Sequence, residues 1–293
     1  MNSKNATIIN NCIESMLSRT RDFQQMTVDF ECDGKIIIDD ADDASGFSIE
    51  SELCQEVFGC NTKGYCNNAI TKNDIMGQLI VVDSLYSTNI NRMRNFALEE
   101  ICDDIWDLCN KGNGIHTLET FTLKINATQK LSPAIASLFT KSYGYIRGEQ
   151  AGKAPSLISK YLFLAKIACP TDIWGFPIYD RIANDLMRDM QRFLGIPVTH
   201  KKQDCLDINN YIAGLKSIID VLEINNPNLW KKLPFLRFQI LDYFLWHIGK
   251  AGKKSYSLLL TKREIQTCYK NGKLEKIPSR IAYWQSIYKK LKK

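Results

Sequence analysis

The chain has 293 residues, of which 45% are hydrophobic and 24% charged, a composition typical of a globular protein and not of a disordered one. Its most apolar stretch, residues 233 to 249, contains Arg237 and Asp242 and falls short of the roughly 20 apolar residues that a transmembrane helix needs. The N-terminus lacks a basic segment followed by an apolar one, so we expect neither secretion nor membrane association.

The net charge of +6 is unevenly distributed along the chain. Residues 250 to 293 carry thirteen Lys or Arg and two Glu, a local net charge of +11, which leaves −5 for the preceding residues. Such a segment suits a polyanion, because neutralised phosphates release counterions and this release supplies affinity independent of sequence. A solvated basic tail is an equally good interpretation.

The cysteines and acidic residues do not match a common metal site. The ten cysteines include no CxxC pair, and only three histidines are present. Three cysteines are evenly spaced by six residues, Cys54, Cys60 and Cys66, and this spacing fits no usual zinc template. Four acidic residues form a cluster that we interpret as the solvated face of a helix: Glu99, Glu100, Asp103 and Asp104. We expect free thiols in a reducing cytoplasm, no metal, and none of the usual nucleotide-binding or hydrolase motifs.

The predicted elements begin with short β-type runs in residues 26 to 40 around the Asp33-Gly34 turn signal, followed by an acidic loop in residues 39 to 48. We therefore divide the chain into an N-terminal extension, residues 1–70, with a short β hairpin and an acidic loop, and a helical domain, residues 71–293. The basic segment 250–293 ends that second domain.

From about residue 72 the pattern becomes helical, because apolar residues recur at spacings of three and four. Residues 116 to 130 are ambiguous, and Ser132-Pro133 is a helix start signal. Core helices are expected in residues 73–90, 89–109, 155–168, 179–195, 208–224 and 229–250, with further helical material in residues 261–270 and 278–290. The predicted fold class is mainly α, a helical bundle.

Two residues stand out within these helices. Lys160 lies in an otherwise apolar helix, where it is either a snorkelling or ion-paired lysine or a desolvated amine that could act as a nucleophile. Asp180 follows Phe176-Pro177-Ile178-Tyr179 at the start of the next helix, where an N-cap role would be a sufficient explanation.

Together these segments resemble the helix-hairpin-helix DNA glycosylases. The turn Gly152-Lys153-Ala154-Pro155 is followed by an apolar helix, a loop and the segment Phe176-Pro177-Ile178-Tyr179-Asp180. This order is similar to the part of that superfamily that presents the catalytic aspartate. The similarity covers roughly residues 140 to 195, and more loosely the helix near Asp74 and the segment 246–250. Residues 156–162 and 245–250 are also similar to uncharacterised bacterial proteins with an 8-oxoguanine glycosylase fold.

The resemblance implies a helical bundle of the helix-hairpin-helix glycosylase type with a small N-terminal β-containing extension, which binds double-stranded DNA without a cofactor. In that superfamily the aspartate stabilises the sugar cation or activates water, and in bifunctional members a lysine attacks C1′; these roles fall to Asp180 and Lys160. The implied DNA contacts are Gly152, Lys153, Ser156, Arg181 and Lys250. The implied walls of a pocket for a flipped base are Trp174, Phe176, Tyr179, Trp246 and His247.

The match departs from the superfamily at two points. The family's hairpin reads apolar-Pro-Gly-apolar-Gly, whereas RGEQAGKAPS offers Gly152 and then a proline where the second glycine would lie. The family's lysine aligns with Leu157, and Lys160 lies three residues further on, nearly on the same helix face. Lys153 is a second candidate nucleophile.

Three functions are consistent with these observations. The first is a DNA base-excision glycosylase, with AP lyase activity if a lysine forms a Schiff base. The alternative is a non-catalytic DNA-binding or genome-defence protein that retains the glycosylase fold. The third is a helical scaffold whose basic tail binds RNA or an acidic partner. All three predict a cytoplasmic protein, associated with the nucleoid if the source is bacterial.

Overall fold

The computed structural model describes residues 2–18, 57–59, 68–85, 97–110, 117–146, 149–179, 181–198, 207–233 and 236–250. The fold in these ranges is mainly helical, as the sequence predicts. Its helices are α1 (Ser3–Ser18), α5 (Lys72–Leu85), α6 (Leu98–Asn110), α7 (Leu118–Lys124), α8 (Pro133–Thr140), α9 (Pro155–Ala168), α10 (Arg181–Leu194), α11 (Ile208–Asn225), α12 (Pro227–Lys232) and α13 (Arg237–Lys250).

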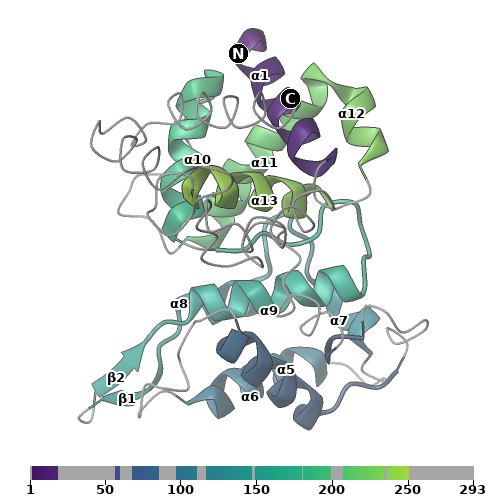
Figure 1. The fold of residues 1–293 in the computed structure, drawn as a ribbon. Coiled ribbons are helices and arrows are strands. Elements are labelled where there is room, and N and C mark those ends of the chain that lie inside the picture. The colour runs from purple at the N-terminus through teal and green to yellow at the C-terminus, as the bar shows by residue number, and fades with distance from the viewer. Residues whose placement is uncertain are drawn as a thin grey trace, which may run out of the picture.

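The helices form two groups with α9 between them (Figure 1). In the first group α5 packs on α6 and α9, while α7 and α8 also contact α9. In the second group α10, α11 and α13 pack on one another, and α1 and α12 complete it. The N-terminal helix α1 therefore belongs to the same group as the last described helix, and its Asn10 accepts a hydrogen bond from the Trp230 indole at 3.0 Å.

Local signals explain where several helices begin. Ser132 caps α8 by accepting a hydrogen bond from the Ile135 backbone N–H, with Pro133 at the first helical position. Thr117 and Thr120 form a capping box at the start of α7, in the stretch whose pattern was ambiguous. Asp207 caps α11 through the backbone N–H groups of two asparagines. Short polar side chains thus set these boundaries.

The two strands that the structure describes lie between α8 and α9. Strands β1 (Tyr143–Ile146) and β2 (Glu149–Gly152) pair antiparallel, with Tyr143 opposite Gly152. The sequence had placed its strand signals in residues 26 to 40, which lie outside the described residues, as do Cys54, Cys60 and Cys66 and residues 251–293. None of the helices in the described ranges combines the length and the apolar character that crossing a membrane requires.

The hydrophobic core runs through both groups of helices. It includes most of α9, from Leu157 to Ala165, and continues into α11 through residues such as Ile218 and Ile219. The loop that leaves α9, residues 169–179, contacts both groups and brings the chain from one to the other. This loop precedes Asp180, so its geometry determines where α10 begins.

Candidate functional site

Lys160 lies on α9 between core residues. Ile158, Ser159 and Tyr161 are fully buried, whereas Lys160 is only partly buried. The lysine therefore lies at the border between the core and the surface of α9.

A hydrogen bond joins this turn of α9 to the chain that precedes Asp180. The Ser159 hydroxyl accepts a hydrogen bond from the backbone N–H of Tyr179 at 2.8 Å and donates one to the carbonyl of Ser156 at 3.0 Å. The Ser159 end of this bond is fully buried, and the Tyr179 end is partly buried. Asp180 follows Tyr179 directly and lies outside the described residues; the side chain of Arg181, the first residue of α10, lies outside them too.

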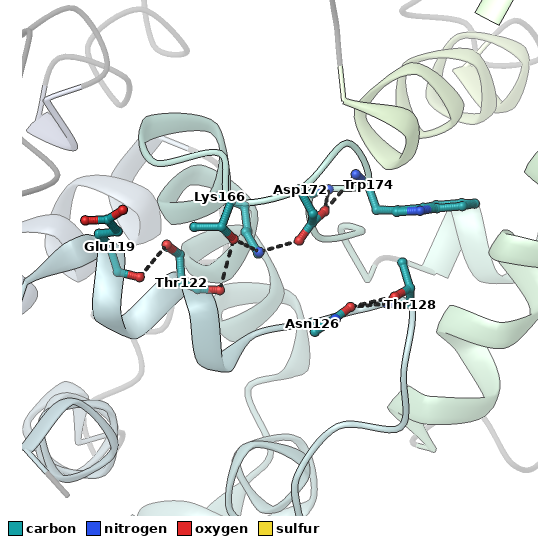
Figure 2. Close-up of polar contacts among 9 residues, drawn as sticks. Glu119, Thr122, Asn126, Thr128, Lys166, Asp172 and Trp174 are labelled. Carbon is teal, nitrogen blue, oxygen red and sulfur yellow. Dashed lines mark hydrogen bonds and ion pairs between the residues drawn. The ribbon is translucent and has the colours of Figure 1, made fainter. Parts of the chain in front are cut away.

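A buried ion pair holds the start of the loop (Figure 2). Lys166, near the end of α9, is 1% exposed, and its ammonium group lies 2.6 Å from the Asp172 carboxylate and also donates to the Thr171 hydroxyl. The Thr171 hydroxyl in turn lies 3.5 Å from the carbonyl of Thr122 in α7. These contacts fasten the loop to α9 and α7.

The second oxygen of Asp172 shapes the following turn. It accepts hydrogen bonds from the backbone N–H groups of Trp174 at 2.7 Å and Gly175 at 3.0 Å. An aspartate whose side chain binds the backbone two and three residues further on stabilises a tight turn. One carboxylate therefore joins Lys166 to the turn that contains Trp174 (Figure 2).

The same turn receives the N-terminus of α13. The carbonyl oxygens of Ile173 and Trp174 each accept a hydrogen bond at 2.9 Å, from the backbone N–H groups of Arg237 and Phe238 respectively. The first amides of a helix lack partners within the helix, so the loop supplies acceptors that α13 needs. The loop is thus bonded to helices of both groups.

Gly175 is required for this arrangement. Its φ of +71° is a conformation that side-chain-bearing residues seldom adopt, and a Cβ built on it would lie 2.9 Å from Leu236 Cδ1. The backbone at Gly175 therefore approaches the residue before α13 more closely than any other amino acid would allow.

Two of the predicted pocket aromatics take part in packing. Phe176 is 1% exposed and stacks on Phe139 with the ring centroids 6.2 Å apart, so it is a core residue. Tyr179 is partly buried and meets the ring of Tyr211 edge-on at 5.0 Å. The Tyr211 hydroxyl donates to the carbonyl of Ile178 at 2.7 Å, which ties the end of the loop to α11.

Trp174 has neighbours on its ring. Its ring centroid lies 5.6 Å from that of Phe238, and the ammonium group of Lys216 lies 4.7 Å from the ring centroid. Lys216 also pairs with Asp220 on α11 at 2.7 Å. A partly buried indole therefore lies beside a partly exposed cation in this loop.

The start of α9 carries the other predicted DNA contacts. Gly152 is the last residue of β2, with nothing within 4 Å of the position of its absent Cβ, and Lys153 is exposed. The N-cap residue Ala154 makes no side-chain hydrogen bond to the helix, so no side chain of the cap serves the first amides of α9. Ser156 is partly buried in the first turn.

The remaining predicted site residues lie on α13. The helix includes Trp246, His247 and Lys250, whose side chains are outside the described residues. Arg237 at the other end pairs with Glu223 at 3.0 Å. The structure therefore assigns Arg237 to an ion pair between α13 and α11 and leaves the positions of the three C-terminal side chains as predictions.

The acidic face of α6 is occupied by structural partners. Asp103 pairs with Lys72, and this hydrogen bond raises the lysine's pKa above its ordinary value. Asp104 lies 2.7 Å from the Lys141 ammonium group, and Glu100 accepts a hydrogen bond from a backbone N–H of β1 at 3.1 Å. Among the described residues, no group of three or more His, Cys, Asp and Glu could hold a metal ion.

Three residues of this site were not identified from the sequence: Ser159, Lys166 and Asp172. Ser159 adjoins Lys160 and gave no signal of its own. Lys166 stands in an apolar run much as Lys160 does, and that similarity could have marked it. Asp172 could have been found only by knowing that the loop turns back toward α9.

Comparisons of the chain with protein-family models, with curated proteins and with solved structures found no match.

Proposed function

We propose that this protein is a DNA base-excision glycosylase of the helix-hairpin-helix type, in which Lys160 is the nucleophile and Asp180 the assisting carboxylate. The observation that carries the proposal is the hydrogen bond from the Tyr179 amide to the Ser159 hydroxyl. It brings the chain one residue before Asp180 against the turn of α9 that contains Lys160.

Covalent geometry makes this juxtaposition informative. Ser159 and Tyr179 are hydrogen-bonded, and Lys160 and Asp180 are the residues that follow them directly. Consecutive Cα atoms lie about 3.8 Å apart. The lysine also has a long, flexible side chain. We propose that this amine and carboxylate share access to one location, which is the first requirement for acting on the same sugar.

The proposed chemistry follows from these two groups. The neutral amine of Lys160 forms a bond to C1′ of the deoxyribose while the bond from C1′ to the base breaks, and the base leaves with that electron pair and takes up a proton. The nitrogen then loses a proton, and its lone pair forms a double bond to C1′ as the C1′–O4′ bond breaks and O4′ takes up a proton, which gives a protonated Schiff base. The carboxylate of Asp180 stabilises the positive charge that develops on the sugar.

Features at the start of α9 support DNA as the partner. The helix offers its first amides without a side-chain cap, next to the exposed Lys153 and the open face of Gly152. A helix N-terminus with free amides favours an anion such as phosphate. The basic segment 250–293, with its local net charge of +11, would add affinity that does not depend on base sequence.

The β hairpin before α9 favours a second candidate, a non-catalytic DNA-binding protein that retains the fold. In the superfamily a glycine-rich turn between two helices precedes the catalytic helix, whereas here Gly152 is paired with Tyr143 in a two-stranded sheet. A protein that has lost that turn could still bind DNA through its positive charge and no longer excise a base.

Borohydride trapping distinguishes the two candidates. The full chain is mixed with duplex oligonucleotides that carry an abasic site or one of a panel of damaged or modified bases, and borohydride reduces any Schiff base to a stable adduct. We expect an adduct with the native chain and with Lys153→Gln, and none with Lys160→Gln. Asp180→Asn should slow base release by about 10²-fold or more, the range for loss of a catalytic group.

If no substrate yields an adduct or an abasic product while the chain still binds duplex DNA, the non-catalytic candidate is correct. Binding that weakens steeply with salt and shows no preference for any base would agree with that outcome. An adduct that persists in Lys160→Gln and disappears in Lys153→Gln would move the nucleophile to Lys153.

A further inference from the structure

Lys166 is the most deeply buried charged side chain among the described residues of the site region, at 1% exposure. A buried ammonium group is costly unless it is paired and hydrogen-bonded. Its partners Thr171 and Asp172 come from the loop, five and six residues further along the chain. The Lys166 amine therefore binds the loop that follows its own helix.

The partner carboxylate is also fully committed. Asp172 is 25% exposed at its side chain, and it uses one oxygen for Lys166 and the other for the amides of Trp174 and Gly175. The turn that it shapes accepts the first amides of α13. A single ion pair therefore links the end of α9, the turn and the start of α13.

The far end of the same loop is the amide of Tyr179, which is bonded to Ser159. The loop is consequently attached to α9 at two points: at Lys166 near the helix end and at Ser159 about two turns earlier. Between these points the chain reverses direction, and it then continues to Asp180. The attachment at Lys166 therefore limits the positions that Tyr179 can reach along α9.

We propose that Lys166 and Asp172 are positioning residues, which hold the loop 171–179 in the arrangement in which the Tyr179 amide is bonded to Ser159, next to Lys160 on α9. The catalytic consequence of this role rests on the proposed glycosylase function. The positioning itself is a property of the folded chain and can be measured without DNA.

The competing explanation is that the pair only adds stability. A buried ion pair is often no more stabilising than an apolar pair of similar volume, while removal of one partner alone is strongly destabilising. Stability therefore cannot separate the two explanations, but the local protection of the loop can. The decisive comparison is between a single and a double variant.

Three variants make this comparison. Asp172→Asn keeps an oxygen for the turn amides and leaves Lys166 buried without its counter-ion. Lys166→Met with Asp172→Asn removes both charges and retains the turn. Asp189→Asn is the control, because it makes the same change in an exposed ion pair, Arg192 with Asp189, at 2.8 Å on α10.

Hydrogen exchange of single amides is the measurement. Three amides report on the loop. The Tyr179 amide attaches the loop to Ser159 on α9, and the amides of Arg237 and Phe238 donate to carbonyl groups of the loop. Amides in the middle of α11 report on global unfolding. Urea unfolding of each variant gives the global stability for comparison.

We expect Asp172→Asn to lose both global stability and loop protection. The double variant should regain most of the global stability, while exchange at the three loop amides stays at least about tenfold faster than in the native chain relative to α11. The control should match the native chain in both measurements. If loop protection returns together with stability in the double variant, the pair is only a source of stability and the proposal is wrong.

Activity then tests the catalytic consequence. In single-turnover base release, the double variant should show a lower rate with an unchanged affinity for DNA, whereas a general loss of structure would change both. A native chain without activity would refute the proposed function and would leave the exchange result as the test of positioning.

Discussion

Replacement of Ser159 by alanine tests the contact on which the site depends. The change removes the acceptor of the Tyr179 amide, a bond of 2.8 Å at a side chain with 0% exposure. The Tyr179 amide loses its acceptor in a part-buried contact, which costs about 1–3 kcal/mol, in addition to the small loss of the hydroxyl's own bond to the carbonyl of Ser156. We therefore expect Ser159→Ala to reduce the free energy of unfolding by about 1–3 kcal/mol.

Ser137→Ala is a matched control for this change. Ser137 lies on α8 and donates to the carbonyl of Ala134 at 2.7 Å, the same three-residue back-bond that Ser159 makes, but it is exposed. Its loss should change stability by less than about 0.5 kcal/mol. Urea unfolding of both variants measures the difference. Equal effects of the two substitutions would refute the argument that the buried hydroxyl anchors the loop.

Three further predictions concern the fold around the site. Gly175→Ala should lower the free energy of unfolding, measured with urea, by about 1–2 kcal/mol because the backbone is left-handed at this position. The loss should be larger still because the new Cβ would lie 2.9 Å from Leu236. Trp230→Phe should lose about 1–3 kcal/mol in the same assay, because the buried Asn10 loses its indole donor at 3.0 Å. Burial raises the pKa of Cys109 from 9.0 to about 12, so its contribution to stability is intact below pH 9 and is lost as the pH rises from about 9 toward 12.

Each of these has a control or a contrary result. Gly152→Ala has open space around its new Cβ and should be nearly neutral, so an effect equal to that of Gly175→Ala would contradict the steric argument. A loss of less than about 0.5 kcal/mol in Trp230→Phe would mean that the indole bond contributes little. Stability measured between pH 8 and 10 should fall less steeply in Cys109→Ala than in the native chain, and equal slopes would contradict the assignment.

The sequence predicted the helices well where local signals are strong. The Ser132-Pro133 start of α8 and the apolar run of α9 depend on neighbouring residues alone, so both could be read from the chain. Residues 116–130 could not be assigned because α7 has seven residues and its capping box uses two threonines, a weaker signal than Ser with Glu. The β hairpin between α8 and α9 was missed because its strands have four residues each and include glycines.

The site was harder to predict because its contacts join residues that are distant along the chain. Lys160 and Lys166 both appear as single cations in one apolar helix, and no local pattern separates them. What makes Lys166 a structural residue is the return of Asp172 to the end of its helix, which depends on packing. The hydrogen bond of Ser159 spans twenty residues and has no sequence signature.

Identification of the trapped residue is the strictest test of the proposal that Lys160 is the nucleophile of a DNA glycosylase. The borohydride adduct with a substrate duplex is digested, and the modified peptide is identified by mass spectrometry. We expect the sugar remnant to be attached to Lys160. Attachment at the exposed Lys153 or at the N-terminal amine, with an unchanged yield in Lys160→Gln, would contradict it.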